Sequence, residues 1–169
     1  VILDVKSGAV RALVGSPDYH ARGAGQVNGA LAARSAGSTL KPFAFARAVD
    51  RGLLTPQRML ADVPALYRDY KPENFDAGYR GLVSARDALV LSLNLPALDV
   101  EQRIGQPVFY DTLRALGLDT LDQPAAHYGL GLVLGNGEVR LLDVVNAYAW
   151  LARGGEARAV RVLEEAEWP

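Results

Sequence analysis

The segment between Gly37 and Gly52 constrains the fold most, because it combines a helix start with a long apolar run. Ser38 is a residue type that often begins helices, and residues 43–49 form an apolar, helix-forming stretch that ends at Gly52. We therefore expect a buried helix with Ser38 at its positive end. Pro42 lacks the N–H that would bond the Ser38 carbonyl, and its ring crowds that carbonyl, so the first turn is expected to be distorted.

Ser38 and Lys41 place a hydroxyl and an amine three residues apart, on one face of this helix. A neutral Lys41 amine could take the proton from the Ser38 hydroxyl as that hydroxyl attacks a carbonyl. Alone the motif is weak, because ordinary exposed helix starts often contain Ser and Lys at this spacing. The glycine before Ser38 and the apolar helix after it favour the catalytic interpretation.

The composition excludes several classes of function. The chain has 169 residues, half of them hydrophobic, which is enough for one domain with a sizeable core. Its net charge of −1 and its scattered basic residues argue against a nucleic-acid surface. The absence of Cys rules out thiolate catalysis and disulfides. The histidines, His20 and His127, have no Cys or carboxylate at ligand spacing, so we expect no metal site and place both in loops or at the surface.

Neither a targeting segment nor a membrane span is visible. No apolar stretch reaches the roughly 18 residues that cross a bilayer, and no charged start leads into an apolar signal segment. The chain begins directly in an expected strand, without an initiator methionine. We expect it to be part of a longer protein.

The first 83 residues contain strand and loop patterns around the Ser38 helix. Two short apolar runs, residues 1–5 and 9–14, flank Lys6-Ser7-Gly8 and predict a β-hairpin. Residues 16–36 are rich in Gly, Ala and Asn and predict a loop with one short helix. Residues 53–79 carry three prolines and several turn residues, which predict an irregular connection.

The second half of the chain is mainly helical in pattern. Ser84 and Asp87 resemble a capping box that opens a helix ending near residues 92–94. The further expected elements are a helix from about Pro96 to Gly105 with Ala97, Leu98, Val100 and Ile104 inward, a helix from Pro107 to Gly117, an apolar glycine-punctuated stretch over 128–137, a helix over 138–153 and a strand over 157–163.

Ser92-Leu93-Asn94 lies at the expected junction between two helices, where its polar side chains could project into a cleft. Alone it would be interpreted as a helix stop, because Ser and Asn are common turn residues. Together with Ser38 and Lys41 it favours a catalytic site.

These motifs resemble the transpeptidase domain of class A penicillin-binding proteins, and the resemblance runs nearly from end to end. Residues 67–76 look most like the penicillin-binding protein 1C subgroup. The matching blocks are Asp4 with Ser7-Gly8-Ala9-Val10 and Ala12-Leu13-Val14-Gly15, Asn28-Gly29-Ala30 with Arg34, Gly37 to Phe43, Ala88-Leu89, Ser92 to Ala97, Tyr128 to Leu132, Leu134-Gly135, Glu138-Val139, Ala147-Tyr148-Ala149 and Gly154-Gly155.

The resemblance implies acyl transfer on the D-Ala-D-Ala stem peptides of peptidoglycan. Ser38 would attack the penultimate D-Ala carbonyl, with Lys41 as general base and Ser92 as proton relay to the leaving amine. Asn94 would hydrogen-bond the substrate backbone and help to hold Lys41. A second stem peptide would accept the acyl group, and penicillin and other β-lactams would acylate the same serine.

The resemblance also implies the fold and the setting. The fold would be α+β and serine β-lactamase-like, with a helical part and an incomplete antiparallel sheet over residues 1–169, a partial transpeptidase domain. The parent protein would carry a glycosyltransferase domain and a membrane anchor and act at the outer face of the bacterial cytoplasmic membrane. No cofactor, metal or nucleic acid is implied.

The third motif of the family, Lys-Thr-Gly or Lys-Ser-Gly on a late strand, is not found after Asn94. Lys6-Ser7-Gly8 has the right letters but precedes Ser38, so we interpret it as a hairpin turn. The family's oxyanion hole combines the N–H of the nucleophile with one from the third-motif strand, and losing one such donor costs roughly 100- to 1000-fold in rate. We expect the chain to stop before that strand and to be weakly active.

Three alternatives use the same pocket. A β-lactamase needs an acid that activates water, and Glu138 more plausibly starts the last long helix. A D-Ala-D-Ala carboxypeptidase would pass the acyl group to water, and a non-catalytic β-lactam or peptidoglycan-binding domain would keep the cleft without turnover. We expect the aromatic residues of the long connection to pack beneath it rather than line the cleft; they are Tyr67, Tyr70, Phe75 and Tyr79.

Overall fold

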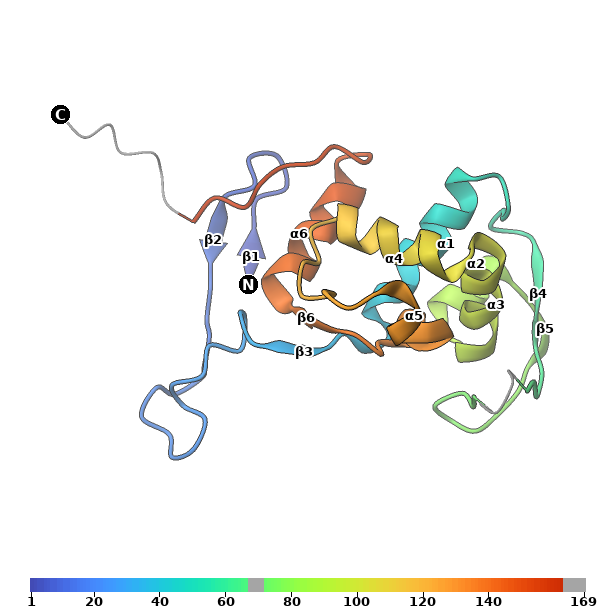
Figure 1. Cartoon of the computed structure of the whole chain (residues 1–169), viewed down its shortest axis with the longest axis horizontal. Helices are drawn as coiled ribbons and strands as arrows, with labels where there is room; N and C mark the ends of the chain where they lie inside the picture. Colours follow the sequence, from blue (N-terminus) through green and yellow to red (C-terminus); the bar gives the residue numbers. More distant parts are fainter. Residues whose placement is uncertain (67–71, 163–169) are drawn as a thin grey trace. The chain divides into compact units, whose positions relative to one another are not determined.

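The computed structural model describes residues 1–66 and 72–162 (Figure 1). The chain divides into two compact units. The first unit contains Val1–Arg34, Arg114–Asp122 and the described residues from Glu138 onward. The second unit contains the described residues of Ser35–Leu113 together with Gln123–Gly137. Ser38, Lys41, Ser92 and Asn94 therefore all belong to the second unit.

The first unit contains short strands and a long helix. β1 (Ile2–Leu3) and β2 (Val10–Ala12) form the predicted antiparallel hairpin, and β3 (Ala33–Ser35) is hydrogen-bonded to β6 (Glu138–Arg140). The helix α6 (Leu141–Ala152) follows β6. In the Lys6-Ser7-Gly8 turn, the Asp4 carboxylate accepts bonds from the Ser7 N–H at 2.7 Å and the Ser7 hydroxyl at 2.6 Å, so these residues form a hairpin turn as predicted.

The second unit is built on helices. The 3-10 helix η1 (Gly37–Leu40) leads into α1 (Lys41–Asp50), which packs against α3 (Asn94–Ile104). Figure 1 shows α1, α2 and α3 close together, with the antiparallel hairpin of β4 (Met59–Asp62) and β5 (Gly81–Ser84) beside α3. The remaining elements are α2 (Ala85–Val90), α4 (Gln106–Ala115), α5 (Ala125–Tyr128) and the 3-10 helix η2 (Gly129–Leu134).

Buried apolar side chains of α1, α3, α4 and η2 contribute to the core of this unit. Ala97, Leu98, Val100 and Ile104 of α3 are buried, as the sequence predicted. The capping box is also confirmed, because the Asp87 N–H donates to Ser84 Oγ at 3.0 Å at the start of α2. With its helices and small antiparallel ribbons, the described part of the chain is α+β, as predicted.

Several predicted elements are wrong. Residues 16–36 form turns and β3 and contain no helix. The connection over 53–79, which was predicted to be irregular, contains the strand β4. Glu138 lies in β6, so the last helix begins only at Leu141, and α3 begins at Asn94 rather than near Pro96. The predicted strand over 157–163 is reduced, within the described residues, to one bridge between Ala9 and Arg161.

Candidate active site

The turn that carries Ser38 is tightly wound. Gly37 has φ +53°, which L side chains rarely adopt, and residues 37–40 form a 3-10 helix before α1 begins. The Lys41 N–H bonds the Ser38 carbonyl, and Pro42 occupies the start of α1. The distortion expected from Pro42 is therefore present as a 3-10 turn. The Ser38 side chain is exposed and lines a pocket of about 500 Å³.

Lys41 is 1% exposed and is bonded to two residues that line this pocket, Ser92 and Asn94. Its Nζ donates to the Ser92 carbonyl oxygen at 2.6 Å, to Asn94 Oδ1 at 2.7 Å and to Ser92 Oγ at 3.2 Å. Burial lowers the pKa of Lys41 from 10.5 to about 8, because desolvation disfavours the ammonium form. The site thus holds an amine that is neutral far more often than a surface lysine at the same pH.

The partners of Lys41 suit the neutral amine as well as the ammonium. The Ser92 carbonyl and Asn94 Oδ1 can only accept, so they take two N–H groups. The Ser92 hydroxyl can accept or donate, and it can therefore donate to the lone pair of a neutral Nζ. Among the described residues no hydrogen bond joins Ser38 Oγ to Lys41 Nζ, although catalytic hydrogen bonds often tighten only when substrate binds.

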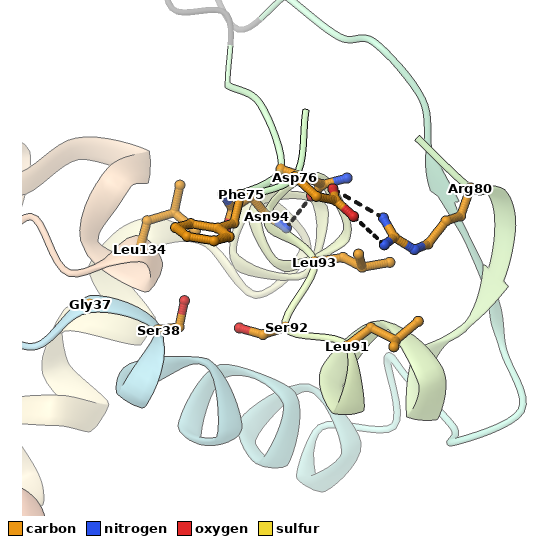
Figure 2. Close-up of a pocket in the computed structure, with 11 residues that line it drawn as sticks. Gly37, Ser38, Phe75, Asp76, Arg80, Leu91, Ser92, Leu93, Asn94 and Leu134 are labelled. Atoms are coloured by element: carbon orange, nitrogen blue, oxygen red, sulfur yellow. Dashed lines mark hydrogen bonds and ion pairs between the residues drawn. The ribbon is translucent and has the colours of Figure 1, made fainter. Parts of the chain in front are cut away.

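Ser92 and Asn94 sit in the sharp connection between α2 and α3. Ser92 has φ +53°, a left-handed conformation that is unfavourable for a residue other than glycine. Leu93 is extended and buried, and Asn94 begins α3. Figure 2 shows the side chains of Ser38 and Ser92 facing each other across the pocket. The structure thus brings together all four site residues expected from the sequence.

The chain segment before β5 supplies Asn74, Phe75, Asp76 and Arg80 to the lining of the pocket. Phe75 lies beside Leu134 above Ser38, and the Arg80 guanidinium pairs with Asp76 at 2.5 Å (Figure 2). Phe75 is fully exposed, at 106%. The prediction that it packs beneath the loop is therefore wrong. Tyr79 is half-buried and is not among the pocket-lining residues; Tyr67 and Tyr70 lie outside the described residues.

The remaining polar candidates do not join this site. His20 and His127 are both exposed, as predicted. Within residues 1–66 and 72–162, no three His, Cys, Asp or Glu side chains are grouped so as to hold a metal ion. None of the helices in that part of the chain is long and apolar enough to cross a membrane.

A family profile described as "Penicillin binding protein transpeptidase domain" matches residues 1–167. The chain belongs to this family. It is 40% identical over 163 residues to penicillin-binding protein 1C of Escherichia coli, covering 96% of the chain and 21% of that protein. It is 33% identical over 172 residues to penicillin-binding protein 1A of Neisseria cinerea, covering 98% of the chain and 21% of the relative.

Solved structures agree with this assignment. Penicillin-binding protein 1A of Haemophilus influenzae matches 88% of the chain and 22% of its own length, with a TM-score of 0.75 and 28% identity. PonA1 of Mycobacterium tuberculosis in complex with penicillin V matches 89% of the chain and 42% of its own length, with a TM-score of 0.75 and 25% identity. The chain spans about a fifth of the length of these two curated relatives.

Three further residues shape this transpeptidase site and were not among the site residues predicted from the sequence. Gly135 has φ +96°, and a side chain there would meet the backbone of Gly37. Asn74 accepts a hydrogen bond from the Asn94 N–H at 2.8 Å, and Asp62 in turn accepts from Asn74 at 2.7 Å. The Pro72-Glu73-Asn74 stretch resembles the family and could have drawn attention to Asn74. Nothing in the sequence pointed to Asp62, which looked like an ordinary loop carboxylate.

Proposed function

We propose that this domain belongs to a peptidoglycan D,D-transpeptidase and that Ser38 is its acylated nucleophile. The observation that carries the proposal is the buried Lys41 amine, held by Ser92 and Asn94, which line the same pocket as the exposed Ser38. Family membership supports the same chemistry, since the matching profile describes a transpeptidase domain.

The reaction has two steps: an acyl-enzyme forms on Ser38, and a second stem peptide then takes the acyl group. Ser38 Oγ attacks the carbonyl carbon of the penultimate D-Ala while Lys41 takes the hydroxyl proton. The Ser92 hydroxyl, 3.2 Å from Lys41 Nζ, relays this proton to the leaving nitrogen, so the C–N bond breaks and the terminal D-Ala departs as a neutral amine. An amine of a second stem peptide then attacks the ester, loses a proton by the reverse relay and frees Ser38.

Asn94 has a double role in this scheme. Its Oδ1 accepts from Lys41, while one N–H of its amide donates to the Glu73 carbonyl at 2.7 Å. An amide nitrogen carries two N–H groups, so one remains for the backbone of the bound peptide. Holding Lys41 and contacting substrate are therefore compatible.

The N–H of Ser38 supplies one donor for the developing oxyanion. No Lys-Thr-Gly or Lys-Ser-Gly follows Asn94 in these 169 residues, so this chain does not itself supply the second donor expected from the family. We expect acylation of the chain by itself to be slow, by roughly 100- to 1000-fold, relative to a form that includes that motif.

Turnover on a synthetic stem peptide ending in D-Ala-D-Ala, with an added amine acceptor, tests the function. Release of D-Ala with a crosslinked product supports the transpeptidase, and release with a hydrolysed product alone indicates a carboxypeptidase. Ser38→Ala should abolish either product. Turnover that survives this substitution would refute the proposed nucleophile.

A β-lactamase has less support from the structure. Glu138, the acid weighed for water activation, lies in β6 and is not among the residues that line the pocket. We therefore expect β-lactams to form a long-lived ester on Ser38. Rapid multiple turnover of nitrocefin would contradict this expectation.

The wider setting follows from the relatives. Since they are penicillin-binding proteins 1C and 1A, we propose that the domain acts in the periplasm or at the outer face of the cytoplasmic membrane. We also propose that the parent is membrane-anchored and carries a glycosyltransferase domain. Detection of both glycan polymerisation and crosslinking by the longer protein would test this proposal.

A further inference from the structure

A buried polar chain leads from β4 to the start of α3. Asp62, at the end of β4, is 0% exposed and Asn74 is 6% exposed. Asp62 Oδ1 accepts from Asn74 Nδ2 at 2.7 Å, and Asp62 Oδ2 accepts from the Arg80 N–H at 2.9 Å. Asn74 Nδ2 also donates to the Gly78 carbonyl at 2.8 Å. These bonds fix the orientation of the Asn74 amide, so its Oδ1 can only point one way.

The Asn74 oxygen is aimed at the first residue of α3. It accepts from the Asn94 N–H at 2.8 Å. The first N–H groups of a helix have no partner within the helix, and a polar side chain at the N-cap usually provides one. Here the N-cap residue is Leu93, which has no side-chain acceptor. Asn74 therefore supplies from another loop the cap that α3 does not carry itself.

This cap lies at a strained and functional turn. Ser92 has φ +53°, and such backbone conformations persist only where surrounding contacts enforce them. The same turn presents the Ser92 carbonyl and Asn94 Oδ1 to Lys41 Nζ at 2.6 and 2.7 Å. A relaxation of the turn would move both acceptors away from the amine.

We propose that Asn74, oriented by the buried Asp62 carboxylate, is a positioning residue that holds the Ser92–Asn94 turn closed over Lys41. Its role in catalysis rests on the proposed function, whereas its effect on the Lys41 environment does not. Asn74 acts through Asn94 and Lys41, and its own hydrogen-bonding groups are engaged by Asp62, Gly78 and Asn94.

Removing the cap of α3 and, separately, the cap of α2 distinguishes a role of Asn74 in positioning the site from a general loss of helix stability. Asn74→Ala removes the cap of α3, and Ser84→Ala removes the cap of α2, whose acceptor bonds the Asp87 N–H at 3.0 Å. We expect Asn74→Ala to slow acylation of Ser38 by benzylpenicillin by about tenfold or more, because small misplacements at a reacting centre are costly. Ser84→Ala should stay within about twofold of the unaltered protein. Equal rate losses in the two variants would overturn the proposal.

A charge swap provides the rescue. Asn74→Asp alone sets two buried carboxylates against each other at the present 2.7 Å contact and should impair acylation. In the double variant Asp62→Asn/Asn74→Asp, the new amide can donate to the new carboxylate, whose other oxygen still accepts from the Asn94 N–H, but the bond to the Gly78 carbonyl is lost. Acylation should recover only in part, to a rate above that of Asn74→Asp. A double variant no better than Asn74→Asp would contradict the orienting role of Asp62.

Titration of Lys41, followed by NMR of its labelled Cε, is independent of acylation. If the turn opens in Asn74→Ala, water reaches the amine and its titration midpoint moves up from about 8 toward 10.5, since burial is what lowers it. Ser84→Ala should leave the midpoint unchanged. An unchanged midpoint in Asn74→Ala refutes the positioning role, even if Ser38 forms no adduct in any variant. A moved midpoint without acylation of the unaltered protein supports it while the proposed function fails.

Discussion

At the scale of single residues, the site depends on where the Lys41 amine is held. The sequence predicted Ser38, Lys41, Ser92 and Asn94 as one site, because the spacing of two short motifs is visible without a structure. The family resemblance implied that Asn94 helps to hold Lys41, but the sequence could not predict that Lys41 would be 1% exposed or that the carbonyl and the hydroxyl of Ser92 would also accept from its amine. Those features depend on packing between α1 and α3.

The lowered pKa of Lys41 predicts the pH dependence of acylation. The neutral amine is the active base, so the rate of Ser38 acylation should rise as pH increases through about 8 and then level off. Lys41→Met should lower the rate by about 100- to 10,000-fold and remove this dependence. Benzylpenicillin acylation rates between pH 6 and 10 test this expectation. If the acylation rate of the unaltered protein instead rose with a midpoint near pH 10.5, burial would not lower the pKa of Lys41.

Glu101 gives a second prediction at this scale. This residue of α3 is 0% exposed, Oε2 accepts from the Val133 N–H at 3.2 Å, and the buried Oε1 has no hydrogen-bond partner among the residues that the structure describes. Burial raises the pKa of Glu101 from 4.5 to about 8. The folded state therefore binds the proton more tightly, and this stabilising contribution is lost as pH rises from about 4.5 through 8.

Glu101→Gln should therefore gain stability relative to the unaltered protein as pH rises from 5 to 9, by about 1 kcal/mol or more. The neutral amide cannot ionise, so it avoids the cost of a buried carboxylate. Urea unfolding at both pH values measures the difference. A difference that is the same at both pH values would mean that Glu101 is already ionised at low pH.

At the scale of elements, the Ser38 turn depends on η2 as well as on α1. The Ser35 hydroxyl donates to the Gly135 carbonyl at 2.9 Å, and the Gly37 N–H donates to Ser35 Oγ at 3.3 Å. A Cβ on Gly135 would lie 2.2 Å from the Gly37 nitrogen. The end of η2 and the start of η1 are therefore packed backbone against backbone.

Gly135→Ala should lower both stability and the acylation rate, because the Gly37 backbone next to the nucleophile must shift. Gly129→Ala is the control for the contact: Gly129 also has positive φ, at +60° with ψ −165°, but its Cβ would meet nothing within 4 Å. It should cost about 1–3 kcal/mol of backbone strain, because that conformation is essentially confined to glycine, and leave acylation within about threefold. Thermal unfolding and benzylpenicillin acylation of both variants provide the test. Equal acylation losses would argue against the contact.

The element predictions failed where tertiary contacts override local pattern. β4 and β5 form a regular hairpin, but Met59–Asp62 ends in a buried carboxylate and is flanked by prolines, so it did not look like a strand. The Asp62 carboxylate can be buried because it accepts hydrogen bonds from the Asn74 side chain and the Arg80 N–H, and these contacts are not visible in the local sequence. By contrast, the capping box at Ser84 is local, and the sequence predicted it correctly.

At the scale of the whole molecule, the four site residues and the pocket belong to one of the two compact units. The family likeness extends over both, since the matching profile covers residues 1–167. The Lys6-Ser7-Gly8 turn belongs to the other unit and is held by Asp4. Its sequence matches the Lys-Ser-Gly form of the third family motif, but in the structure these residues form the turn of the β1–β2 hairpin.

Lys6→Ala should therefore leave acylation of Ser38 unchanged within about twofold, because Lys6 is exposed and the bond that it accepts from Arg158 is made by its backbone carbonyl. Lys41→Met serves as the positive control in the same benzylpenicillin assay. A loss with Lys6→Ala comparable to that with Lys41→Met would show that the hairpin turn takes part in the reaction.

Intact mass after incubation with excess benzylpenicillin above pH 8, with Ser38→Ala alongside, tests the central claim most directly. We predict that the unaltered protein gains a single slowly formed adduct and that the variant gains none. An adduct that persists in Ser38→Ala, or the absence of any adduct on a chain shown to be folded, would contradict the assignment of Ser38 as an activated nucleophile.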